Sequence, residues 1–186
     1  MSEFVAAPGQ TVGPFFHYAL PYDDGPHLVP PGSPGAIRVH GTVYDGAGLP
    51  VPDALLEIRQ ADPSGRVPRV EGSLRRSGVF TGWGRAATDA AGRYAFTTLE
   101  PGPTREGAAP YFAVTVFARG LLDRLFTRIY LPGPAAESDP LLTSLPEDRR
   151  PTLIATRDDA GNLRHDIHLQ GESETVFLTF PAHADR

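Results

Sequence analysis

Hydrophobic residues recur at every second position over several short stretches of this chain, which is the pattern of β-strands. At 37–43, isoleucine, valine and glycine alternate with polar residues, and a similar alternation returns at 163–169. The most hydrophobic run, APYFAVTVFARG, covers 109–120, and a β-branched and aromatic run, ETVFLTF, covers 174–180. Amphipathic helices do not separate these stretches. The pattern therefore predicts an all-β protein.

Turn sequences of the form Asp-x-x-Gly lie between the predicted strands. DGAG interrupts the segment 36–62 and DAAG interrupts 84–102, so each segment is predicted to form a hairpin. Residues 125–133 offer a partner for the strand at 109–120, and the polar segment 134–150 allows one short helical turn. Regularly spaced strands of this kind predict an antiparallel β-sandwich with long loops.

The chain length of 186 residues is typical of one domain. Residues 1–36 are rich in proline and glycine and cannot sustain a helix or a central strand, so they are predicted to form an extended arm at a subunit interface. Residues 37–186 are predicted to form the single sandwich domain. Within it, residues 62–82 show no sustained periodicity of hydrophobic residues, which predicts a long ordered loop.

Composition excludes several classes of function. The net charge of −5 argues against a broad surface for nucleic acid or acidic membrane. The absence of cysteine excludes disulfides, thiolate zinc sites and cysteine nucleophiles. Neither a secretory leader pattern nor a run of about 18 apolar residues occurs. We therefore expect a cytoplasmic protein.

The sequence HDIH at 165–168 is the obvious candidate for a metal site. On a strand, side chains three apart point to opposite faces, so His165 and His168 would not bind one ion. Nucleophile elbows and phosphate-binding glycine loops are also missing. The sequence thus predicts no metal site and no catalytic residue of its own.

Two segments, HGTVYDGAGLPVPDALLEIRQADPSGRV and TDAAGRYAFTTLEPG, resemble the intradiol ring-cleavage dioxygenases. These β-sandwich enzymes use ferric iron, held by two tyrosines and two histidines, to open catechols. Matched to the family motifs, Val67 and Thr104 stand at the tyrosine positions, and Phe112 and Val114 stand at the histidine positions. None of them is a phenolate or imidazole ligand, so the resemblance implies a scaffold that has lost its iron site.

Three more segments, QTVGPFFH, FARG and residues 149–180, extend the resemblance to the α subunits of two-subunit family members. The resemblance implies an αβ multimer in which a β subunit of the same fold binds the ferric iron. It implies protocatechuate, a carboxylated catechol, and dioxygen as substrates. It also implies that this chain lends substrate-binding residues to a site at the subunit interface. By position these are Thr11, Gly13, Pro14 and Arg119.

The chemistry of Arg119 suits that role, because a guanidinium forms strong charge-assisted hydrogen bonds with a carboxylate. On a straight strand its side chain would leave the face that Phe112 and Val114 share, which favours a contribution to a neighbouring chain. Two alternatives stay open at this point. One is a non-enzymatic transthyretin-like β-sandwich binding module. The other is an independently active intradiol enzyme, which requires iron.

Overall fold

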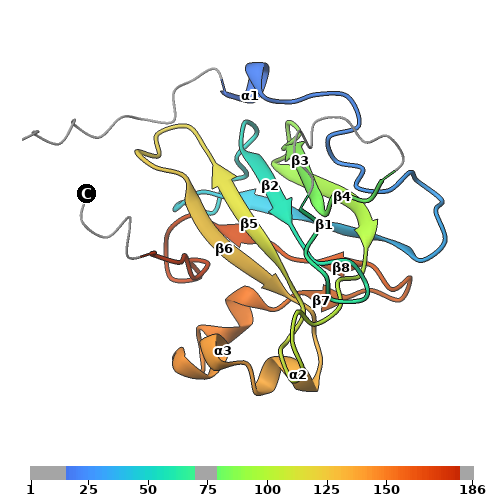
Figure 1. Ribbon diagram of the computed structural model, residues 1–186. Coiled ribbons are helices and arrows are strands. Elements are labelled where there is room, and N and C mark those ends of the chain that lie inside the picture. Colours follow the sequence, from blue (N-terminus) through green and yellow to red (C-terminus); the bar gives the residue numbers. More distant parts are fainter. Residues whose placement is uncertain (1–15, 70–78, 181–186) are drawn as a thin grey trace, which may run out of the picture.

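Two β-sheets pack face to face in the computed structural model, which describes residues 16–69 and 79–180 (Figure 1). Thr11, Gly13 and Pro14 lie outside the described residues. The four-stranded sheet is antiparallel throughout and has the order β3 (Trp83–Ala87), β2 (Leu55–Arg59), β5 (Tyr111–Phe117), β6 (Leu125–Tyr130). The five-stranded sheet has the order β4 (Arg93–Leu99), β1 (Ala36–Tyr44), β8 (Leu163–Arg164), β7 (Thr156–Arg157), and β9 (Ile167–His168) also pairs with β1.

The core lies between the sheets and follows the predicted alternation. Along β1, Val39, Gly41 and Val43 are buried, and along β5 the buried residues are Phe112, Val114 and Val116. Because successive strand residues face opposite sides, each strand presents one apolar row to the other sheet. The prediction of an antiparallel β-sandwich is confirmed, and most strand pairs are antiparallel; β8 and β9 run parallel to β1.

Both predicted Asp-x-x-Gly hairpins are wrong in their pairing. β1 pairs with β4, and β2 pairs with β3 and β5, so the chain changes sheets after each turn. The first turn itself is tight, since the Asp45 carboxylate accepts hydrogen bonds from the Ala47 and Leu49 amides. Alternation determines which side chains point inward but does not determine the partner strand. The predicted pairing of residues 109–120 with 125–133 is confirmed as β5–β6.

Short helical segments replace the single helical turn predicted at 134–150. They are α2 (Pro134–Glu137), α3 (Pro140–Ser144) and the 3₁₀ helix η1 (Arg150–Leu153). Asp139 caps α3 by accepting hydrogen bonds from the Leu141 and Leu142 amides, and Pro140 occupies the first turn. The prediction of a strand at 174–180 is wrong, since these residues form no strand, although the Leu178 amide donates to the Phe126 carbonyl.

The segment before β1 closes one side of the sandwich. The Gly25 carbonyl accepts from the Arg85 amide on β3, and the Leu28 amide donates to Thr97 on β4. Leu28 is buried in the main core. This segment therefore spans the edge strands of both sheets. The first described element, α1 (Phe16–Ala19), lies at the end of the molecule opposite α2 and α3 (Figure 1).

Candidate functional site

A pocket of about 130 Å³ opens near the start of β5, on the face of the four-stranded sheet that points away from the core. Its lining comes from the end of β2, the start of β5 and two loops, and consists of Arg59, Gln60, Ala61, Val67, Gly102, Thr104, Ala109, Pro110, Tyr111 and Ala113. Two of the four predicted vacant ligand positions, Val67 and Thr104, thus meet at one site. Both side chains are exposed.

Glycines allow the two loops to meet. A Cβ at Gly65, whose φ is +84°, would lie 2.0 Å from the Pro103 carbonyl oxygen, and one at Gly102 would lie 2.3 Å from the Pro63 carbonyl oxygen. Asp62 orders the first loop, since its carboxylate accepts hydrogen bonds from the Ser64 and Arg66 amides. Only residues without a side chain permit this backbone approach.

Phe112 and Val114, the other two predicted vacant ligand positions, do not line this pocket. Their side chains are 0% and 2% exposed, within the core on the opposite face of β5. The β5 residues that line the pocket are Tyr111 and Ala113. The sequence pattern already indicated that these side chains are buried, because Phe112, Val114 and Val116 form the uniformly apolar row that a sandwich must bury.

The pocket residues do not fit a ferric ion. Such an ion takes several nitrogen and oxygen ligands, whereas the pocket supplies one phenol, from Tyr111, and no imidazole or carboxylate. Across the described residues, no group of three or more His, Cys, Asp or Glu could hold a metal ion. The lining of this pocket therefore supplies no ligand set for a ferric ion.

Two arginines flank Ala113, whose side chain forms the floor of the pocket. Arg59 on β2 and Arg128 on β6 are both the cross-strand partners of Ala113. The Arg128 guanidinium lies 4.2 Å from the centre of the Tyr111 ring, and its Nη1 donates to the Tyr130 hydroxyl at 2.8 Å. That hydroxyl donates to Asp139 at 3.0 Å. Burial raises the pKa of Tyr130 to about 12, so this chain of hydrogen bonds holds a neutral phenol.

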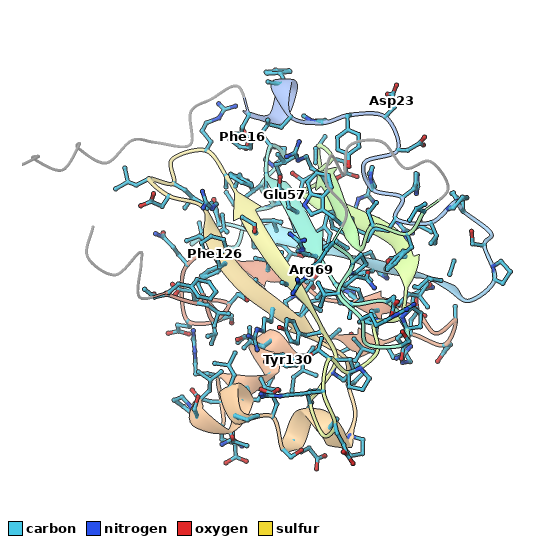
Figure 2. The ribbon with its side chains drawn as sticks, viewed as in Figure 1. Phe16, Asp23, Glu57, Arg69, Phe126 and Tyr130 are labelled. Atoms are coloured by element: carbon cyan, nitrogen blue, oxygen red, sulfur yellow. The ribbon has the colours of Figure 1, made fainter. Side chains whose placement is uncertain are left out.

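Arg119 lies at the other end of β5. Tyr111 and Phe117 are the first and last residues of the strand, which puts about 20 Å between them at the usual rise per residue. Figure 2 shows Phe16 toward the upper end of the sheet and Tyr130 toward the lower end. The Phe16 and Phe117 ring centres are 6.4 Å apart, so the start of the described chain packs at the Arg119 end. Arg119 is therefore remote from this chain's own pocket.

The two histidines of HDIH have separate surroundings. His165 is 4% exposed, and its Nε2 lies 3.0 Å from the Thr152 carbonyl oxygen. Burial lowers the pKa of His165 to about 4. The His168 ring stacks on Tyr44 with a centroid distance of 4.9 Å. Each ring thus has a packing role in the sandwich.

Similarity to known proteins agrees with this architecture. A family model described as "Dioxygenase" matches residues 12–171. The chain is 39% identical to the protocatechuate 3,4-dioxygenase alpha chain of Burkholderia cepacia, covering 96% of this chain and 99% of that one. It is 35% identical to the alpha chain from Pseudomonas putida, covering 93% and 96%. It is 34% identical to the beta chain of Burkholderia cepacia, covering 75% of this chain and 66% of that one.

Solved structures of dioxygenases also share this fold. The dioxygenase domain of a carbohydrate-binding fusion protein from Streptomyces sp. SirexAA-E has a TM-score of 0.59 at 27% identity, covering 87% of this chain and 94% of that one. Catechol 1,2-dioxygenase from Acinetobacter sp. ADP1, at 19% identity, shares the fold with a TM-score of 0.57, covering 83% of this chain and 60% of that one. Within the described residues, no helix is both long and apolar enough to cross a bilayer. With the family model and the two alpha chains matching almost its whole length, the chain belongs to the intradiol dioxygenase family.

Proposed function

We propose that this chain is the α subunit of a protocatechuate 3,4-dioxygenase, paired with a β subunit of the same fold that binds ferric iron. One observation carries the proposal. The chain matches alpha chains of that enzyme along nearly their full length, while its own pocket offers neither imidazole nor carboxylate for iron. The transthyretin-like alternative finds no support in these similarities. The cytoplasm remains the expected location.

The proposed reaction opens the ring of protocatechuate between its two hydroxylated carbons. Both atoms of dioxygen enter the product, 3-carboxy-cis,cis-muconate. The ferric iron of the partner chain would bind the catechol oxygens and make the ring reactive toward dioxygen. This chain would form one wall of that pocket.

Arg119 is the residue to which we assign a charged role in that wall. Its side chain is 64% exposed although it is ion-paired, and it lies at the far end of β5 from this chain's own pocket. A guanidinium in this setting can bind the substrate carboxylate through charge-assisted hydrogen bonds. The roles of Thr11, Gly13 and Pro14 remain predictions from the sequence.

Co-expression with a family β subunit tests the proposal. We expect the two chains to co-purify, and the complex to cleave protocatechuate with iron bound in proportion to the β chain. Expressed alone, this chain should be inactive and poorly soluble, because a permanent interface leaves apolar surface exposed. Stoichiometric ferric iron with a phenolate-type visible absorption in this chain alone would contradict the assignment.

A further inference from the structure

We propose that the pocket at the Tyr111 end of β5 binds a small aromatic carboxylate with a single ring. This would be a ligand site of the chain itself. The size, lining and charge of the pocket alone support this proposal, which therefore does not rest on the proposed function. Arg119 takes no part in it.

The size and walls of the pocket suit one ring. Its volume of about 130 Å³ is close to that of a cavity of roughly 150 Å³ known to accept benzene. Most of the walls are hydrocarbon, from Ala61, Val67, Ala109, Pro110 and Ala113. Ala113 sits on a strand paired on both sides, yet its side chain is exposed. Its short side chain leaves the floor open to a flat ligand.

The charge beside that floor is positive. Arg59 lines the pocket, and in the described part of the chain its guanidinium has no ion pair or hydrogen bond. Arg128 is held over the Tyr111 ring from the other neighbouring strand. No lining residue is acidic. A cation in a pocket without an acidic lining residue, next to apolar walls, is the arrangement that attracts an organic anion.

The nearby carboxylates do not neutralise these arginines. Asp62 accepts hydrogen bonds from Ser64 and Arg66, and Glu57 is paired with Arg85, whose Nε donates to it at 2.9 Å. The side-chain amide of Gln60 is also occupied, because it donates to the Leu99 carbonyl and accepts from Thr98. Among the lining side chains, the polar groups left for a ligand within the described residues are the Arg59 guanidinium, the Thr104 hydroxyl and the Tyr111 hydroxyl. They suit one carboxylate better than a phosphate, which needs more donors.

Fluorine NMR titration of the assembled protein with 4-fluorobenzoate tests the proposal. Ala113→Leu should fill the pocket, so the binding lost in this variant reports this site alone. Arg59→Gln should weaken that binding about tenfold, in line with the loss of one charged hydrogen bond. Arg93→Gln, which removes an exposed arginine at the start of β4 that does not line the pocket, should leave it unchanged. Ala113 is exposed, and a thermal melt of the variant checks that it folds.

Crystals soaked with 4-bromobenzoate locate the ligand directly. We expect an anomalous bromine peak beside Ala113 in the unmodified protein, no such peak in Ala113→Leu, and no peak with the neutral 4-bromobenzamide. Any of three results would overturn the proposal: an empty pocket, equal occupancy by the amide, or wild-type affinity in Arg59→Gln. None of these would affect ring cleavage by the complex, so the proposed function would stand or fall separately.

Discussion

Arg119 and Asp53 form an ion pair in which Nη2 lies 2.6 Å from Oδ2, and only the aspartate is largely buried. Asp53 precedes β2 and Arg119 follows β5, where Leu55 pairs with Phe117 at the end of the ladder. The carboxylate thus holds the guanidinium from one side. The exposed side of Arg119 keeps donors available for a second anion.

Replacing Arg119 by alanine in the assembled αβ complex should lower kcat/KM for protocatechuate at least tenfold, since a charged hydrogen bond contributes about 1.5–3 kcal/mol. Iron content should not change. Activity toward catechol, which has no carboxylate, should fall much less. Steady-state kinetics with both substrates check this. Unchanged kinetics for protocatechuate would refute the substrate role.

Replacing Asp53 by asparagine should have a smaller effect on the same reaction. The variant keeps the side-chain shape but loses the charge that orients Arg119, and an exposed pair contributes about 0.2–1 kcal/mol. We expect KM for protocatechuate to rise roughly two- to fivefold, with the melting temperature nearly unchanged. Combining both substitutions should add nothing to Arg119→Ala alone. An additive double variant would show that Asp53 acts independently.

Gly41→Ala should destabilise the sandwich by about 3 kcal/mol or more, because overpacking a core shifts its backbone. A Cβ at this position would lie 1.7 Å from the His165 carbonyl oxygen, which also accepts a hydrogen bond from the buried Tyr94 hydroxyl. Gly46→Ala is the control, since its Cβ meets only the flexible Gln170 side chain, at 3.1 Å. Urea unfolding of the assembled protein measures both. A Gly41→Ala midpoint equal to that of the control would refute the packing argument.

His165 should make stability fall as the pH is lowered from about 6.5 to about 4. Burial lowers its pKa to about 4 in the folded state, so in this window the unfolded chain binds a proton that the folded chain excludes. The loss amounts to roughly 3 kcal/mol across the window. It is absent above pH 6.5, where the histidine is neutral in both states.

The free energy of unfolding at several pH values tests this dependence. The slope between pH 6.5 and 5 should become shallower in His165→Asn and should be retained in His168→Gln, which changes a half-buried histidine nearby. Equal slopes in the unmodified protein and His165→Asn would contradict the argument.

Most of the strands, the tight turns and the family could be predicted from the sequence, because these depend on neighbouring residues. Alternation along β1 indicated the buried row, and the Asp45 side chain makes its turn locally. The match of Val67 and Thr104 to ligand positions was also local, and the structure brings both to one pocket.

Tertiary structure decided the pairing of strands and the composition of the pocket. β1 and β2 are consecutive in the chain but lie in different sheets. Each strand pairs where its row of apolar side chains becomes buried in the core. Motif matching assigned Phe112 and Val114 to ligand positions, but in the structure both are buried in the core. The β5 residues that line the pocket are Tyr111 and Ala113. Arg59 and Arg128, far apart in the chain, lie on either side of Ala113 only because β2 and β6 flank β5. Contacts between distant residues form on folding, and no local pattern encodes them.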